Sequence, residues 1–391
     1  MKKTSLLVIF LVVLIDLIGF GIVIPILPYY ALKYGASGLT IGWLMMSYSL
    51  MQFLVAPLWG RLSDRIGRRP VLLISMLGSC ASLTLLGFAS SLEWLFIGRV
   101  LAGICGANIS TAYAYIADIT TEKDRAKGMG LIGASFGIGF ILGPAIGGVL
   151  SVYGYGAPML AAAGLAGANF ILASVILGEP LQNSEARAAK RSRRPGLTVI
   201  GQVLSYRPTG LPIALFFIFT LAVTQMEVTF AIFLKHMYGF DARMAGYLLA
   251  MIGFIMALIQ GGLIGKLSKR FGEYRLILGG SLFCAAGLLI FGMTSVLSVA
   301  VLGLLFLAIG HGVLHPALSS LTSLGAQPSE KGVTMGVFHS ASSFARVVGP
   351  PTAGFLYDSM NPRAPFLSGT FLVFTVFVIL AVGRSPERNA R

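Results

Sequence analysis

Long apolar runs alternate with short polar segments along the whole chain. An apolar run of about 20 residues crosses the hydrocarbon core of a bilayer once as an α-helix. The pattern predicts twelve such helices, and the Gly and Pro residues inside them are tolerated in membrane helices. The expected spans are 5–30, 40–59, 70–90, 94–117, 128–152, 157–177, 210–234, 243–264, 275–294, 297–322, 333–357 and 364–383. The expected fold class is therefore an all-α integral membrane protein.

The composition agrees with this pattern and fixes an orientation. Hydrophobic residues make up 56% of the chain and charged residues only 11%, whereas a soluble domain carries roughly 25% charged residues. A net charge of +15 would indicate nucleic acid binding in a soluble protein, but here the basic residues lie between apolar runs. Of the 29 lysines and arginines, two lie within spans and four lie in loops on one side of the membrane. The remaining 23 lie on the opposite side. The two within spans are Arg99 and Arg346, and the four are Lys33, Lys235, Arg243 and Arg363. The positive-inside rule then predicts a multi-pass protein of the inner (plasma) membrane, with both termini in the cytoplasm and no nucleic acid partner.

A charged segment between two spans occurs twice. Gly60-Arg-Leu-Ser-Asp-Arg-Ile-Gly67 recurs as Gly265-Lys-Leu-Ser-Lys-Arg-Phe-Gly272, and Gly143-Pro144 recurs as Gly349-Pro350 at nearly the same offset. Six spans repeated in one orientation are typical of transporters whose halves move about a midplane site. We expect an N-terminal six-helix bundle over 1–178, a basic cytoplasmic linker over 179–207 and a C-terminal six-helix bundle over 208–391.

The same segments carry a resemblance to a known family. The stretch from Gly60 to Arg69, and the glycine-rich run from Gly133 to Gly148 in span 5, resemble the signature motifs of the major facilitator superfamily, in its twelve-helix drug:proton antiporter branch. The N-terminal half is similar to bacterial tetracycline efflux pumps. Those pumps carry an acid in span 3, and this chain has none between Ser75 and Ala89. The resemblance therefore implies the fold and the transporter class but not tetracycline as the substrate.

The resemblance also implies a switch at the cytoplasmic surface, where a charge cluster joins and separates as the protein opens and closes. In span 5, small residues allow close helix packing, and a Gly-Pro pair weakens the helix. The residues expected to act as gate or conformational switch are Gly60, Asp64, Arg65, Arg68, Arg69, Asp118, Gly143 and Pro144.

Ionisable residues inside the spans are candidates for proton coupling, because an ionised group at bilayer depth costs at least about 2.5–3.5 kcal/mol on insertion scales. Glu227 lies in the middle of span 7, where a carboxyl can hold a proton in one state and release it in another. His311 and His315 share one face of span 10, and His339 lies in span 11. Asp16 and, by resemblance, Arg99 complete the set. The alternatives are a carboxyl bonded to a neighbouring helix, packed histidines, and an interfacial arginine at position 99.

Substrate contacts are predicted from polar and aromatic side chains within the spans. An apolar cavity with few polar groups suits an amphipathic organic molecule. An arginine near mid-depth, Arg346, requires either a partner acid or an anionic ligand. The candidate substrate-binding residues are Asn108, Gln52, Tyr113, Gln225, Phe230 and Arg346.

The expected function is secondary active transport: efflux of lipophilic or cationic small molecules in exchange for protons, by alternating access. The sequence has no nucleotide-binding fingerprint, metal-ligand cluster or catalytic triad. We therefore expect no enzyme, no metal and no cofactor, with the proton gradient as the energy source. The expected partners are the small-molecule substrate, protons and membrane lipids, and the expected state is a monomer. Two alternatives stay open: a uniporter or symporter of a metabolite, sugar or lysolipid, and a non-transporting receptor or scramblase.

Overall fold

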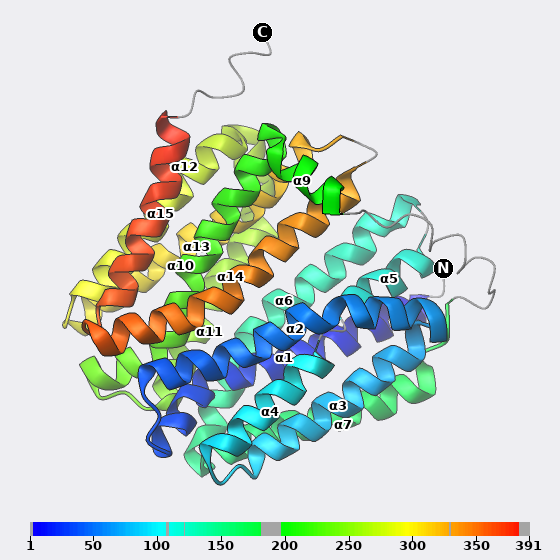
Figure 1. Cartoon of the computed structure of the whole chain (residues 1–391), viewed down its shortest axis with the longest axis horizontal. Helices are drawn as coiled ribbons and strands as arrows, with labels where there is room; N and C mark the ends of the chain where they lie inside the picture. Colours follow the sequence, from blue (N-terminus) through cyan, green and yellow to red (C-terminus); the bar gives the residue numbers. More distant parts are fainter. Residues whose placement is uncertain (1–2, 107–108, 121, 181–196, 328–329, 383–391) are drawn as a thin grey trace. The chain divides into compact units, whose positions relative to one another are not determined.

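A computed structural model describes residues 3–106, 109–120, 122–180, 197–327 and 330–382, and these residues form helices without any β-strand (Figure 1). The first half contains α1 (Lys3–Lys33), α2 (Gly38–Ile66), α3 (Arg68–Gly87), α4 (Leu92–Cys105), α5 (Ile109–Ile119), α6 (Glu122–Leu150), the 3-10 helix η1 (Ser151–Tyr153) and α7 (Gly156–Ile176). The second half contains α9 (Leu197–Ser205), α10 (Arg207–Tyr238), α11 (Ala242–Leu258), the π-helical turn η2 (Ile259–Leu263), α12 (Ile264–Met293), α13 (Leu297–Gly325), α14 (Lys331–Ser359) and α15 (Ala364–Val382).

The helices follow the predicted spans closely. Within the described residues, nine helical stretches are long and apolar enough to cross a membrane, and one of them, the 52-residue stretch Ala242–Met293, covers two predicted spans. The fourth predicted span is divided between α4 and α5, and the eleventh is α14. The all-α membrane fold class is therefore confirmed, while the count of twelve crossings stays a prediction.

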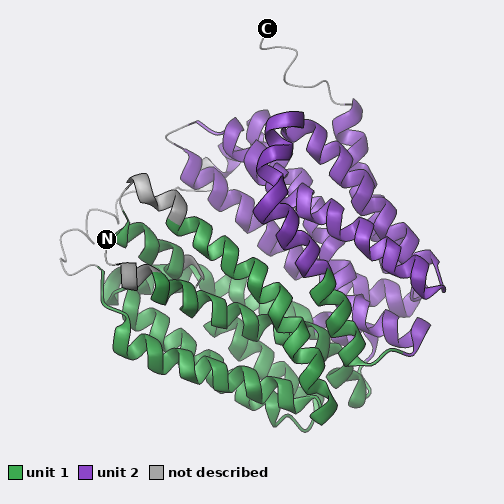
Figure 2. Ribbon diagram, turned by 180° about the vertical axis from the view of Figure 1, so that it is seen from behind, with its two compact units in different colours: residues 1–36, 44–194, 240–251 green, residues 37–43, 195–239, 252–391 purple. Residues whose placement is uncertain are grey.

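The chain separates into two compact units (Figure 2). Unit 1 comprises residues 1–36, 44–194 and 240–251, and unit 2 comprises residues 37–43, 195–239 and 252–391. Helices α2 and α11 each contribute residues to both units. The predicted domain boundaries stay a prediction. Helix α9 lies inside the predicted linker, and the basic stretch 187–194 of that linker is outside the described residues.

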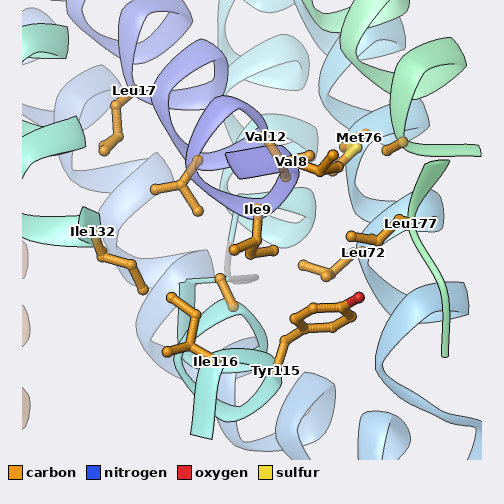
Figure 3. Packing of buried hydrophobic residues seen from close by; sticks show 13 residues of the cluster. Val8, Ile9, Val12, Leu17, Leu72, Met76, Tyr115, Ile116, Ile132 and Leu177 are labelled. Carbon is orange, nitrogen blue, oxygen red and sulfur yellow. The ribbon is translucent and has the colours of Figure 1, made fainter. Parts of the chain in front are cut away.

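Unit 1 is built around α1, which is apolar at most positions on all of its faces. Its side chains Ile9 and Val12 pack with Leu72 and Met76 of α3 and with Tyr115 of α5 (Figure 3). A helix that is hydrophobic all round belongs inside a bundle, in contact with neighbours on several faces. Helix α1 accordingly packs on both α6 and α7.

The two units repeat one packing scheme. In unit 1, α1 packs on α6 and α7, and α3 packs on α4 and α7; in unit 2, α10 packs on α14 and α15, and α12 packs on α13 and α15. The Tyr34 hydroxyl donates to the carbonyl of Ala89, and one repeat later the Tyr238 hydroxyl donates to the carbonyl of Thr294. These parallels between segments more than 200 residues apart support the internal duplication.

The charged segment at residues 60–69 forms a tighter turn than the sequence indicated. Helix α2 continues to Ile66 and α3 begins at Arg68, so that Gly67 alone separates them. Gly67 has a φ of 109° and its repeat partner Gly272 has a φ of 74°. Glycine adopts such positive φ values without steric cost, which explains why both copies of the segment end in this residue.

Helix α4 ends at Cys105, inside the predicted span 94–117, and a turn follows at Gly106. Side chains of the two preceding helices donate to the last carbonyls of α4: Trp59 to Ile104, Ser75 to Cys105, and Gln52 to Gly106. These donors satisfy polar groups that would otherwise be costly within a bilayer. The hydrophobicity of residues 94–117 gives no sign of them.

The glycines of α6 allow close packing on α1. A Cβ atom at Gly143 would lie 2.6 Å from the Cα of Gly21, and one at Gly139 would lie 2.7 Å from the Cβ of Leu17. Farther along α6, a Cβ atom at Gly148 would lie 3.3 Å from the Cα of Gly246 in the first part of α11, also in unit 1. The glycine-rich face of α6, which was expected to serve as a gate, is thus used mostly for packing on α1.

The substitution Gly143→Ala tests this packing. It should destabilise the protein by about 1–3 kcal/mol, because an added methyl group in a filled interface forces the helices apart. The measurement is the midpoint of thermal unfolding in detergent. Gly133→Ala is the matched control, since a Cβ atom at Gly133 of the same helix meets nothing within 4 Å. Equal unfolding midpoints for the two variants would contradict the close packing of α6 on α1 at Gly143.

Candidate functional site

Glu227 of α10 and Arg346 of α14 form an ion pair inside unit 2. The Arg346 Nη1 atom lies 3.4 Å from the Glu227 Oε2 atom, and the side chains are 37% and 19% exposed, respectively. Among the open alternatives for Arg346, the structure provides the partner acid. The pair has one contact and a partly open guanidinium, so it is accessible to a proton or a ligand.

Gln225 lies two residues before Glu227 and is almost fully buried. Its Nε2 atom donates to the Thr352 hydroxyl of α14 at 3.5 Å, and its Oε1 atom is buried without a hydrogen-bond partner. A lone buried acceptor is costly unless a donor reaches it at some stage. Gln225 therefore supplements the ion pair from within the α10–α14 contact.

The histidines of α13 do not join this ion pair. The His311 ring meets the edge of Phe219 at 5.1 Å, and the His315 ring meets Phe216 at 5.2 Å, both in T-shaped geometry. Phe219 precedes Glu227 by eight residues, or about 12 Å along α10. Glu227, His311 and His315 were each predicted as candidates for proton coupling, and the structure places the two histidines beside a part of α10 that precedes Glu227.

Unit 1 holds a second group of membrane-depth polar residues. The Arg99 guanidinium is buried and lies 4.4 Å from the centroid of the Tyr48 ring, a cation–π contact. Its Nε atom has no hydrogen-bond partner. Gln52 donates to the Gly106 carbonyl at 3.0 Å and reaches the Tyr48 hydroxyl at 3.4 Å. Asp16 is half-buried in α1.

Two of the predicted substrate contacts, Tyr113 and Phe230, lie elsewhere. Tyr113 packs against the hydrophobic core of unit 1. Phe230 is fully buried and stacks on Phe291 at 5.5 Å, so in this structure it has a packing role. Asn108 lies outside the described residues. The roles predicted for the site residues stay predictions, and Glu227, Arg346 and Gln225 are the ones that the structure brings together.

The predicted switch cluster has a defined geometry in unit 1. The Arg68 Nη1 atom lies 2.7 Å from Asp64 Oδ1, and the Arg68 Nε atom lies 3.2 Å from Asp118 Oδ2. Asp118 is 1% exposed and Arg68 is 6% exposed. Breaking a buried ion pair by removing one partner costs about 3–5 kcal/mol. Three helices therefore meet at Arg68: α2, α3 and α5.

Other predicted switch residues lie around this cluster. The Arg69 Nη2 atom donates to the Ser174 carbonyl of α7, while Arg65 is exposed at the end of α2. Gly60 provides the carbonyl that accepts the Ser63 hydroxyl. Gly143 and Pro144 lie in α6, away from the charges of this cluster.

Glu179 belongs to the cluster and was not predicted. Its two carboxylate oxygens accept the backbone N–H groups of Arg68 and Arg69 at 3.0 Å each. A carboxylate at a helix N-terminus is favoured by the helix dipole and by the unpaired N–H groups there. Glu179 fixes the start of α3 from the end of the sixth span. The sequence signal, a single acid before Pro180, is too weak to identify it.

The second copy of the segment carries the opposite charge at the same place. Glu273 replaces Arg68, and its Oε1 atom accepts the hydroxyls of Ser268 and Ser320 at 2.7 and 3.0 Å. Ser268 is the repeat partner of Ser63, which accepts a hydrogen bond from Arg68. The backbone of the turn is therefore repeated, while its charge network is found in unit 1.

Comparisons with known proteins agree with this architecture. The family model of the Major Facilitator Superfamily matches residues 9–350 and, in a second match, 262–391. The class D tetracycline resistance protein of Salmonella ordonez is 32% identical over 382 residues, which cover 96% of each chain. Multidrug resistance protein 2 of Bacillus subtilis is 27% identical over 100% of this chain and 97% of the relative.

Solved structures show the same fold. The human organic anion transporter MFSD10 (TETRAN) superposes with a TM-score of 0.71 at 26% identity, over 97% of this chain and 99% of that one. A bacterial homolog of the human lysosomal transporter Spinster superposes with a TM-score of 0.77 at 16% identity, over 96% and 94%. The expected resemblance to drug:proton antiporters is confirmed, and this multi-pass membrane protein belongs to the major facilitator superfamily of small-molecule transporters.

Proposed function

We propose that this chain exports lipophilic or cationic small molecules in exchange for protons. The observation that carries the proposal is the Glu227–Arg346 ion pair, a single acid and a single base in contact at membrane depth in unit 2. The similarity of the chain to tetracycline and multidrug resistance proteins also supports export of small molecules.

The ion pair supports coupling through competition. Protonation of Glu227 removes the negative charge that attracts Arg346, and a cationic substrate beside Glu227 replaces the proton. Proton and substrate then bind the same carboxylate in turn, which is the requirement for exchange. The proton gradient supplies the energy, and no cofactor or chemical change of the solute is needed.

The charge cluster at Arg68 is proposed to hold the cytoplasmic side closed and to separate when that side opens. The basic loops support placement in the inner membrane with both termini in the cytoplasm. We further propose that the protein acts as a monomer surrounded by lipid.

An organic anion is the second candidate substrate, because the Arg346 guanidinium is more exposed than its partner and the similar MFSD10 is an organic anion transporter. An anion on Arg346 would withdraw it from Glu227 and so favour protonation of Glu227. Anion and proton would then cross the membrane in the same direction, as in symport, whereas exchange moves the two solutes in opposite directions. Proton flux in liposomes after addition of a cationic or an anionic substrate distinguishes the two candidates: the proton moves against the cation or with the anion.

The substitution Glu227→Gln tests the proton carrier. It should abolish uphill transport driven by an imposed proton gradient in liposomes, because the amide cannot exchange a proton. Substrate binding and downhill movement should stay measurable. Glu93→Gln removes an exposed carboxylate of α4 and serves as the control. Uphill transport by Glu227→Gln at the wild-type rate would exclude this residue as the carrier.

A double-mutant cycle tests the ion pair itself. Arg346→Gln should lower the unfolding midpoint in detergent by leaving a partly buried carboxylate without its partner. The double variant Arg346→Gln with Glu227→Gln should recover part of that loss, with a coupling of about 0.5–3 kcal/mol for residues in contact. Strictly additive effects would show that the two side chains do not interact in solution.

The substitution Asp118→Asn tests the switch cluster. We expect the transport rate to fall by at least about tenfold, since Arg68 is left buried with weaker compensation, while substrate binding is kept. Glu273→Gln is the control in the second copy of the segment, at the repeat position of Arg68, where the partners of the carboxylate are hydroxyls, and its rate should stay near wild type. If both variants transport equally well, the cluster in unit 1 has no special part in the cycle.

A further inference from the structure

Helix α14 carries a polar stripe that the ion pair alone does not explain. His339, Ser343 and Arg346 follow each other at spacings of four and three residues, which places them on one face of the helix. Gly336 and Ser340 lie beside them, and Gly336, His339 and Ser340 are exposed. The opposite face, with Val337, Phe338 and Ala345, is buried.

This stripe is unsuited to contact with lipid. Ionisable and polar side chains within membrane helices face a bundle interior or a water-filled cavity, because hydrocarbon offers them no hydrogen bonds. Helix α14 has 29 residues but is not among the stretches of the described chain that are apolar enough to span a membrane. The exposed face of α14 therefore borders water in at least one state of the protein.

The stripe leads from one end of unit 2 to the ion pair. His339 precedes Arg346 by seven residues, or about 10 Å along the helix. The Ser343 hydroxyl lies between them and donates to the His339 carbonyl at 3.0 Å. On the other side of His339 the helix runs to Lys331, at the end predicted to be cytoplasmic.

Aromatic rings fix the position of His339. Its ring meets the edge of Phe338 at 5.5 Å, and Phe338 stacks on Phe216 of α10 at 3.8 Å. The His315 ring of α13 makes a T-shaped contact with the same Phe216 ring, with the centroids 5.2 Å apart. His339 and His315 are thus both placed near Phe216, on the part of α10 that precedes Glu227.

We propose that His339 relays protons between the Glu227–Arg346 pair and water at the Lys331 end of α14. The imidazole accepts a proton at one ring nitrogen and gives one up at the other, which leaves it neutral as its other tautomer. A ring flip or proton exchange with water restores the first tautomer before the next transfer. Water along Ser343 completes the distance to Glu227. This role rests on the proposed proton exchange at Glu227 and assigns its route.

The groups that influence His339 are few. Glu227 lies on α10, His311 and His315 on α13, and Arg346 on α14 itself. Helices α9 and α15, which also pack against α14, carry no titratable side chain in their described residues. The first residues of α2, Gly38–Trp43, approach α14 at Pro350 and Gly354 and carry none either.

Thiol labelling tests whether the stripe meets water. Cysteine is placed at Gly336, Ser340 or Ser343 in an active variant without Cys80, Cys105 and Cys284, and is exposed to a charged, membrane-impermeant methanethiosulfonate. Labelling should be at least about tenfold faster than at Phe371→Cys, since only a thiol in water forms the reactive thiolate. Phe371 is 71% exposed on α15 but apolar. Equally slow labelling at all four positions would overturn the proposal.

The substitution His339→Gln tests the relay. Gradient-driven transport should fall by about tenfold, which is modest for loss of a proton-transfer group, and its dependence on cytoplasmic pH should weaken. Exchange of labelled for unlabelled substrate, which moves no net proton, should be unchanged. His236→Gln, at the exposed end of α10, is the matched control.

The outcomes separate this inference from the proposed function. If Glu227→Gln fails to drive transport while His339→Gln keeps the wild-type rate and pH dependence, the relay is wrong and the carrier stands. If Glu227→Gln still transports uphill, the proton exchange on which the relay depends is itself wrong.

Discussion

A charge in hydrocarbon has to be neutralised or hydrated, and this requirement governs how the ionisable residues of the chain are placed. Glu227 and Arg346 lie on different helices, more than 100 residues apart, and contact each other in unit 2. The long, single contact and the partial exposure of both groups leave the attraction modest. A fully buried ion pair with two hydrogen bonds would cost more free energy to separate when its carboxylate takes up a proton. The weakness of the pair is thus consistent with a working part of a transporter.

Much of the fold could be predicted because it depends on patterns that are local. Apolar runs fixed the helices to within a few residues, and the copy at Gly265 revealed the duplication. Contacts between helices were much less accessible. Glu179, which caps α3, is one acid among fourteen in the chain, and nothing near it in sequence indicates its distant partners. The pairing of Arg346 was likewise left open, because its partner lies 119 residues away.

The sequence predicted which residues of the site are chemically important better than it predicted where they lie. Glu227 stands out because an acid in an apolar span needs a reason, and this argument holds for any fold. The histidines at 311 and 315 were proposed on the same ground, yet their ring partners Phe219 and Phe216 lie about two and three helical turns from Glu227 along α10. Helical spacing shows which residues share a face of one helix, but it does not show the level at which two helices meet.

The divided span formed by α4 and α5 has a consequence for biogenesis. Helix α4 has 14 residues and is about 21 Å long, so it does not by itself cross a hydrocarbon core of about 30 Å. The donors for the last carbonyls of α4, Trp59, Gln52 and Ser75, belong to α2 and α3, which leave the ribosome first. The end of α4 can therefore be solvated by protein as soon as it enters the bilayer, before any part of the second half has been made.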